Sequence, residues 1–251
     1  MLSESQSVNL TPVPIHAAAK NDWPMLPVFA SVRVKYCKRG DARYFSHLDL
    51  QRTVLRVLSR AGIPMWYSQG FNPHPKVVFA VPLSIGVESV CELLDLRIER
   101  DMPANVIMEK LNAELTDDMR VLEVYSPVSS FNDVAMADYT ARIYWPTLTG
   151  EAVERADIAL RTSPVNIVKM GKAGEKTVDI VPLISYMDWK EIEGGWEMKM
   201  RLSATQEAYL NPESVLEAMR SVLGMGPEDP ADEWHTVMRT DVLDAAGRSF
   251  R

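Results

Sequence analysis

The alternation of apolar and polar positions changes along the chain and predicts its first elements. Ser31–Cys37 (SVRVKYC) alternates apolar and basic residues, as a half-buried strand does. Ser46 is placed to cap a helix, with Asp49 three residues later as in a capping box, and Gly62 followed by Pro64 ends that helix. Its apolar residues recur at helical spacing and are expected to face a core: Leu50, Val54, Val57, Leu58 and Ala61.

The same patterns extend to the end of the chain. Strands are expected at 77–81, 90–99 and 119–125 with a helix at 103–115, which gives the order β-α-β-β-α-β. The rest repeats this order, with strands at 137–145, 165–170, 177–187, 196–202 and 234–242 and helices at 151–162 and 212–223. We therefore predict an α+β protein of two tandem ferredoxin-like (βαββαβ) domains with antiparallel sheets, over 31–128 and 136–251, after a flexible N-terminal extension over 1–30.

Composition favours a water-soluble chain with a proper core. Apolar residues make up 47% of the chain and charged residues 24%, which are ordinary globular values. No apolar run approaches the roughly 20 residues of a membrane span, and the N-terminus lacks a signal-peptide pattern. Cytoplasmic location without a membrane partner is expected. Cys37 and Cys91 form no CxxC pair and favour free thiols, with a disulfide between them as the open alternative.

Charge is distributed unevenly along the chain. Residues 31–76 hold nine Lys and Arg against two Asp, a net charge of +7, and because the whole chain carries −7 the remainder carries −14. Arg52, Arg56 and Arg60 lie four residues apart on one helix face. Basic residues flanked by aromatic ones are typical of single-stranded RNA binding. Solvated surface charge is the alternative.

The candidate site residues gather in the same region. The loop 67–76 (YSQGFNPHPK) contains a stiff Pro-x-Pro segment that presents His74 and suits recognition of a phosphate or a base edge, unless its apolar residues only cover the sheet. His47, in the first helical turn, is placed to contact an anion or to act as a general base, unless it is a plain surface residue. The candidate substrate-binding residues are Lys38, Arg43, Ser46, His47, Asp49, Arg52, Arg56, Ser68, Gln69, Phe71, Asn72, His74 and Lys76.

Several other chemistries find no support in the sequence. His47 and His74 are the candidate catalytic residues, but they lack the HxxxH or HExxH spacing of a metal site. No Walker-type loop, GxGxxG or GxSxG motif occurs. We therefore expect no metal and no cofactor.

One run of motifs resembles a known family. KRGDARYFSHLDLQRTVLRVLSRAGIPMWYSQGFNPHPKVVFAVPLSIGVES, followed by CELLDL, resembles the radical-SAM-linked protein family of unknown function, through K-x-G-D-x-R-[FY]-x-SHLD-x-x-R and SQGFNPHPK. KTVDIVPLI at 176–184 fits the family's second half, so that the resemblance covers roughly 32–251. Members are encoded beside, or fused to, a B12-binding-type radical-SAM protein, often near RNA-processing and ribosomal genes. The resemblance implies a separate radical-SAM protein as partner and an RNA-linked role.

Three functions are compatible with these observations. The preferred one is an RNA-binding or substrate-presenting accessory protein that works with a radical-SAM enzyme in RNA modification or processing. The second is a metal-independent RNA-processing enzyme that uses His47 or His74. The third is a protein–protein adaptor without RNA contact, whose acidic C-terminal half docks a basic partner.

Overall fold

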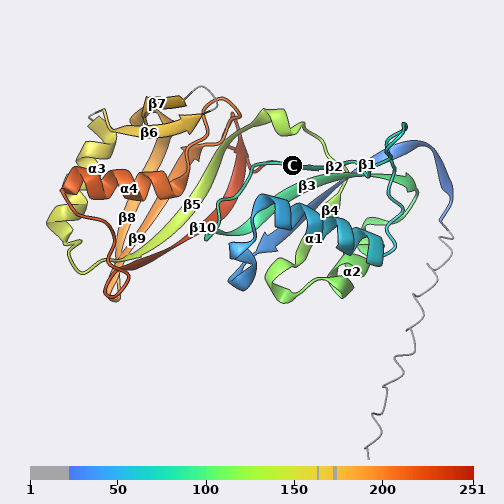
Figure 1. Ribbon diagram of the computed structural model, residues 1–251, viewed down its shortest axis with the longest axis horizontal. Coiled ribbons are helices and arrows are strands. Elements are labelled where there is room, and N and C mark those ends of the chain that lie inside the picture. The colour runs from blue at the N-terminus through green and yellow to red at the C-terminus, as the bar shows by residue number, and fades with distance from the viewer. Residues whose placement is uncertain (1–22, 163, 172–173) are drawn as a thin grey trace, which may run out of the picture.

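A mixed sheet runs through the length of the protein and carries helices from both halves of the chain (Figure 1). The computed structural model describes residues 23–162, 164–171 and 174–251. In the first half of the chain the elements are β1 Met25–Lys38, η1 Gly40–Tyr44, α1 His47–Arg60, β2 Val77–Phe79, β3 Glu88–Arg100, α2 Ala104–Glu114, η2 Asp117–Met119 and β4 Val121–Tyr125. In the second half they are η3 Phe131–Asp133, β5 Val134–Tyr144, α3 Gly150–Thr162, β6 Asn166–Gly171, β7 Gly174–Asp179, η4 Val181–Leu183, β8 Ile184–Ile192, β9 Gly195–Ser203, α4 Pro212–Leu223 and β10 Trp234–Asp244.

The strand order explains how the two halves are joined. The sheet runs β4-β1-β3-β10-β5-β9-β8, with β2 also paired to β3, and β6 and β7 form a separate hairpin. The pairs are antiparallel except that β10 runs parallel to β3 at Met238–Glu88 and Arg239–Ser89. The α+β class is confirmed, but the expectation of purely antiparallel sheets was wrong. Periodicity identifies strands and leaves their partners undecided, and the parallel pair makes one mixed sheet of both halves. The ferredoxin-like description and the domain boundaries stay predictions.

Helix α1 forms for the reasons that its sequence indicates. The Ser46 hydroxyl accepts the Asp49 amide hydrogen (N to Oγ 3.2 Å) and donates to the Asp49 carboxylate (2.6 Å). The apolar stripe of α1 is buried with Ile107 and Leu111 of α2. Both helices cover one face of β1 and β3, whose alternate residues point into this first core: Val32, Val34, Leu94, Leu96 and Ile98.

The second half encloses its own core under α3 and α4. Leu160 of α3 and Met219 of α4 pack onto the sheet with Ala141 of β5 and Met200 of β9, all almost fully buried. Asn211 caps α4 by accepting the Glu213 amide hydrogen at 3.2 Å. Cys91 and Leu93, at the start of β3, also belong to this core, so that the second core reaches across the junction.

Two segments differ from the prediction. β1 begins at Met25, inside the expected N-terminal extension, and Met25 and Ala30 pair with Arg100 and Ile98 of β3. The register shifts between Met25 and Ala30, around Pro27, which has no amide hydrogen to donate to the neighbouring strand. Residues 1–22 lie outside the described residues. β7 begins at Gly174, three residues before the strand expected from 177.

The junction between the halves buries opposite charges. Arg239 of β10 is 1% exposed, and its Nη1 donates to Oε1 of Glu92 on β3 at 2.9 Å. The same guanidinium donates to the carbonyl oxygens of Val81 (3.0 Å) and Pro82 (2.9 Å) and to the Tyr139 hydroxyl (3.2 Å). Because its donors are satisfied by several segments, Arg239 connects β3, the 81–82 loop and β5 around the parallel pair.

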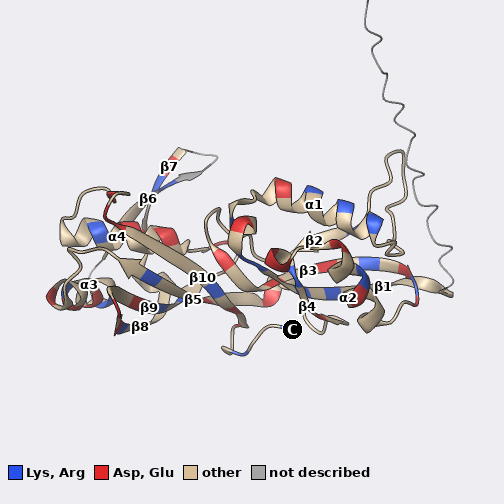
Figure 2. Cartoon of the chain, turned by 90° about the horizontal axis from the view of Figure 1, so that it is seen from below, with Lys and Arg blue, Asp and Glu red and all other residues tan. Residues whose placement is uncertain are grey.

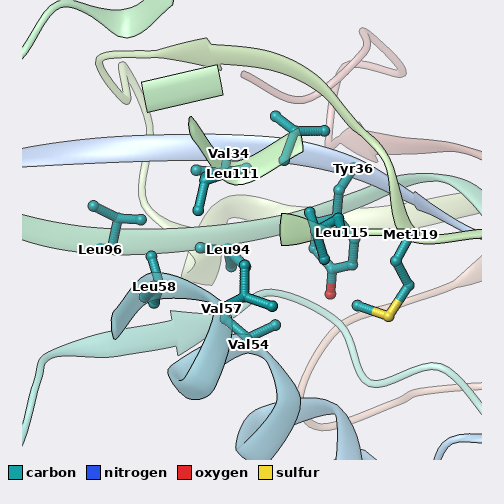
Figure 3. Close-up of a pocket in the computed structure, with 11 residues that line it drawn as sticks. Val34, Tyr36, Val54, Val57, Leu58, Leu94, Leu96, Leu111, Leu115 and Met119 are labelled. Carbon is teal, nitrogen blue, oxygen red and sulfur yellow. The ribbon is translucent and has the colours of Figure 1, made fainter. Parts of the chain in front are cut away.

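The first core also contains a small cavity of about 20 Å³, drawn in Figure 3. Its walls are aliphatic side chains of the strands and of α1 and α2, with Met119 and Tyr36. A space of this size holds at most one water molecule, and such a molecule needs two to four polar partners. The cavity is therefore a packing gap and not a ligand site.

Two further findings concern the cysteines and the helices. Cys37 and Cys91 are both buried free thiols, and burial raises the pKa of Cys91 to about 12. Within residues 23–162, 164–171 and 174–251, no helix has both the length and the apolar character that crossing a membrane requires.

Candidate nucleic-acid interface

Two of the predicted binding residues support the chain that precedes α1. Lys38 is 1% exposed, and its Nζ donates to the carbonyl oxygens of Arg43 (3.1 Å) and Phe45 (3.3 Å). Burial lowers the pKa of Lys38. The Arg43 guanidinium lies 3.9 Å from the Glu88 carboxylate, which also accepts the Gly40 amide hydrogen at 2.8 Å. Lys38 thus stabilises the turn that precedes Ser46, and its buried side chain is not available to a ligand.

His47 lies at the exposed start of α1. Its Nε2 is 2.8 Å from Nε2 of Gln51, one turn later, and its ring packs edge-on against Phe79 with centroids 5.5 Å apart. The Asp49 carboxylate accepts a hydrogen bond from the Ser46 hydroxyl at the helix cap. His47 is therefore oriented by Gln51 and by the end of β2, with one ring edge left for solvent or a ligand.

The loop that carries His74 is organised by its own hydrogen bonds. The Ser68 amide donates to the His74 carbonyl oxygen at 2.9 Å, and the His74 amide donates to the Ser68 hydroxyl at 3.1 Å. Nδ1 of His74 lies 3.0 Å from the same hydroxyl and 3.3 Å from the Asn72 carbonyl oxygen. Phe71, at the tip, is completely exposed. The loop therefore holds a large apolar ring in water on a defined backbone.

The structure does not bring the two histidines together. His47 contacts Gln51 and Phe79, whereas His74 contacts Ser68 and Asn72, and no interaction between described residues links the two sets. His47 begins α1, a helix of 14 residues that is about 21 Å long, and His74 lies in the loop that follows this helix. Among the described residues, no three His, Cys, Asp or Glu side chains are grouped as metal ligands.

The basic residues of 31–76 divide into structural and free ones. Arg33 and Lys38 are buried, and Lys35, Arg43 and Arg60 lie near Glu123, Glu88 and Glu114. The remaining four are exposed and form no ion pair within the described part of the chain: Arg39, Arg52, Arg56 and Lys76. Figure 2 shows the basic residues spaced along α1. We call two arginines of this row, Arg52 and Arg56, the α1 stripe.

Gln69, Asn72 and Lys76 complete the set of predicted residues. All three are exposed, and their side chains form no hydrogen bond with another described residue. Together with Phe71 and His74 they make the loop a surface of polar and aromatic groups. Lys76, the last residue of the loop, is held next to β3, since the Arg97 amide donates to the Lys76 carbonyl oxygen at 3.3 Å.

Sequence reasoning missed an aromatic cluster on the other face of the sheet. The Arg97 guanidinium lies 4.1 Å from the Phe29 ring centroid and 5.5 Å from that of Trp66. Trp66 lies within the basic region 31–76, but Phe29 lies in the expected N-terminal extension. The available signal was the alternation of β3, where Asp95 and Arg97 interrupt apolar residues and must face away from the first core.

The fold and these surfaces define an α+β protein with one mixed sheet and an exposed basic helix. The chain belongs to the family described as "Uncharacterized protein conserved in bacteria (DUF2344)", whose model matches residues 31–212. That description names no activity, and the radical-SAM link stays a prediction. The comparison with curated proteins gives no match.

Solved structures share only a distant likeness. A chain of the "Crystal Structure of a Cbf5-Nop10-Gar1 Complex" matches with 11% identity and a TM-score of 0.46, covering 88% of this protein and 56% of that chain. This protein therefore spans little more than half of that relative. An unknown protein from Galdieria sulphuraria matches with 10% identity and a TM-score of 0.24, covering 84% and 99%. Likenesses this weak carry no argument about activity.

Proposed function

We propose that the protein is an RNA-binding accessory protein that presents RNA to a separate radical-SAM enzyme. The observation that carries this proposal is the α1 stripe. Most basic residues of the region are buried or lie near acidic partners, but Arg52 and Arg56 are exposed and unpaired within the described residues. Cations without structural partners are available to phosphates, which dominate affinity for nucleic acid.

The loop 67–76 supports the same proposal. Its hydrogen bonds between Ser68 and His74 order the backbone before any ligand binds, which reduces the entropy lost on binding. Phe71 then offers a ring on which a base can stack. In the same proposal each half is a ferredoxin-like unit, since the strand orders β4-β1-β3-β2 and β10-β5-β9-β8 follow one scheme.

The radical-SAM partner rests on the family resemblance of the SHLD and SQGFNPHPK motifs. Those motifs are largely exposed at the start of α1 and in the loop, whereas Lys38, from the preceding K-x-G-D-x-R motif, is buried. Of the alternatives, an RNA-processing enzyme is the less favoured, because the rings of His47 and His74 are hydrogen-bonded only to Gln51, Ser68 and Asn72 among the described residues, none of which is an acid or base. A protein adaptor is favoured by Phe71, since exposed aromatic residues are common anchors in protein interfaces.

The test compares the affinity of the protein for a fluorescently labelled cellular RNA pool at two salt concentrations. Arg52→Gln/Arg56→Gln removes the α1 stripe and is expected to weaken binding and to reduce the slope of log affinity against log salt by about 2. Arg155→Gln is the matched control, because Arg155 is exposed on α3 and unpaired within the described residues. Circular dichroism checks the fold of each variant.

The outcomes separate the candidate functions. Loss of RNA binding in the double variant, with Arg155→Gln unchanged, supports the proposal, and recovery of a radical-SAM protein by affinity purification supports its second part. If the wild type binds no RNA but retains a partner after nuclease treatment at high salt, the adaptor function replaces it. RNA cleavage that disappears in His47→Ala/His74→Ala would instead establish the enzyme.

A further inference from the structure

A second surface of the first half has the character of a nucleotide-binding site. In β1 and β3 the residues that alternate with the first core lie on the face turned away from α1 and α2. We call this the helix-free face of the first half. It carries Ser31, Arg33 and Lys35 of β1 and Asp95 and Arg97 of β3, which pair across the strands as Ser31–Arg97 and Arg33–Asp95.

Three side chains from separate segments form a platform at one end of this face. Phe29 comes from β1, Trp66 from the segment after α1 and Arg97 from β3. The Phe29 and Trp66 ring centroids lie 5.1 Å apart with the rings tilted by 50°, and the Arg97 guanidinium lies over both. The Trp66 amide donates to the Arg97 carbonyl oxygen at 2.8 Å, so that the platform is anchored by backbone as well as by packing.

The Arg97 guanidinium has unused hydrogen-bonding capacity. Its side chain makes no hydrogen bond and no ion pair with any residue that the structure describes, although it is only partly exposed. A planar guanidinium carries five N–H donors that match a phosphate group. The rings hold Arg97 in place while its donors remain available, which is the arrangement that a ligand-binding arginine requires.

A cavity of about 230 Å³ adjoins the platform. Its lining includes Ser31, Lys76, Val78 and Arg97 from the strands and the end of the loop, and Phe131 and Asn132 from η3. This volume is below the roughly 300 Å³ at which sites for drug-sized ligands begin. The cavity therefore suits one nucleotide unit at a surface rather than an enclosed cofactor.

The charge of the cavity is positive. Asp95 also lines it, but its two carboxylate oxygens accept from Nε and Nη2 of the buried Arg33 at 2.7 and 2.8 Å. That pair is internally neutral, which leaves Lys76 and Arg97 as the uncompensated charges among the lining residues. Phosphate is the complementary group, and the Asn132 side chain at the wall can hydrogen-bond a base edge.

We propose that the helix-free face binds single-stranded RNA, with a base stacked on the Phe29–Trp66–Arg97 platform and a phosphate held by Lys76 and Arg97. Aromatic rings and arginine planes on an open sheet are a recurrent way to bind unpaired bases. This inference rests on the proposed function and deepens it by naming the form of the ligand. It also gives Lys76 a role at a site away from the α1 stripe.

The experiment measures the anisotropy of a fluorescein-labelled ten-nucleotide oligouridylate with the full-length protein. Trp66→Ala and Arg97→Gln are each expected to weaken binding about tenfold, or about 1.4 kcal/mol, because each removes part of the surface on which a base stacks. The second half provides matched controls. Trp234 is exposed and stacked on Tyr144 at 3.8 Å, and Arg142 is exposed beside Glu197, so that Trp234→Ala and Arg142→Gln should leave affinity unchanged.

A second measurement uses only the wild-type protein and therefore does not depend on whether a variant folds. Ultraviolet crosslinking of the same RNA to wild-type protein, followed by peptide mapping, is expected to mark peptides that contain Phe29 or Trp66. A duplex of the same length should bind at least tenfold more weakly, because its bases are not available for stacking.

The outcomes distinguish this inference from the proposed function. If Trp66→Ala and Arg97→Gln bind as the wild type does while Arg52→Gln/Arg56→Gln does not, the helix-free face is not an RNA site and the α1 stripe alone carries the function. If the face variants lose a copurifying protein and keep RNA, the face is a protein contact and the inference is overturned. If the wild type binds no RNA, both fail.

Discussion

The sheet of each half carries an ion pair on the face away from its helices, and the two pairs differ in how far they are buried. Each half pairs an arginine with an aspartate directly across its first and third main-sheet strands. In the first half Arg33 of β1 faces Asp95 of β3, and in the second half Asp138 of β5 faces Arg201 of β9. The geometry is almost identical, because Nε and Nη2 donate at 2.7 and 2.8 Å in one pair and at 2.7 and 2.9 Å in the other.

The surroundings of the pairs differ. The Arg33 side chain is 0% exposed, with the Phe131 ring 4.2 Å and the Phe250 ring 5.1 Å from its guanidinium, whereas the Arg201 side chain is 34% exposed. Hydrogen bonding to Asp138, opposed by burial, raises the pKa of Arg201. We infer that residue type and pairing alone do not determine how much an ion pair contributes to stability, because this contribution also depends on which residues cover the pair.

The largest expected effect lies between the halves. Arg239→Met leaves the Glu92 carboxylate buried without its cation and is expected to lower the free energy of unfolding by about 3–5 kcal/mol. Urea denaturation measures the change. Adding Glu92→Leu should recover most of it, because an apolar pair can replace a buried ion pair. A full loss in the double variant would show that the backbone contacts to Val81 and Pro82 hold the junction instead.

The buried pair of the first half is next. Arg33→Met is expected to lower the free energy of unfolding by about 3 kcal/mol, because Asp95 loses the buried guanidinium that Phe131 and Phe250 cover. The same urea titration applies. A loss below about 1 kcal/mol would mean that Asp95, 25% exposed, is adequately solvated, and the contrast between the halves would disappear.

The exposed pair of the second half should matter less. Arg201→Met is expected to cost about 1 kcal/mol or less, since a solvated pair is worth little and is screened by salt. Titration at low and high salt checks this, with the cost declining at high salt. A cost equal to that of Arg33→Met would contradict the argument from exposure.

The last expected effect is a pH dependence that arises in the second half. Nδ1 of His235 lies 2.8 Å from Glu228 and Nε2 lies 2.9 Å from Glu213. Burial opposes its charge, but hydrogen bonds to both carboxylates outweigh burial and raise the pKa of His235 from 6.5 to about 9. The histidine therefore stabilises the fold fully below pH 6.5, and this stabilisation is lost as pH rises through about 9.

The check is the free energy of unfolding measured from pH 6 to 10. The wild type is expected to lose stability across this range, and His235→Gln should lose less because it has no proton to release. Equal slopes in both proteins would place the effect elsewhere.

The sequence by itself determined the elements and their capping. The helix at 212–223 begins and ends as expected, with Asn211 as its cap, and all five residues predicted for the apolar stripe of α1 are buried. These features are local, since they depend on spacing within one turn or one strand and on the hydrogen bonds of neighbouring residues.

Only the tertiary structure decided which residues meet. The partnership of β3 with β10, the burial of Lys38 and Arg33, and the gathering of Phe29, Trp66 and Arg97 join residues far apart in the chain. Periodicity places a side chain on a face but says nothing of what covers that face. His47 of the SHLD motif and His74 of the SQGFNPHPK motif likewise contact different residues, because a helix and a loop lie between them in the chain.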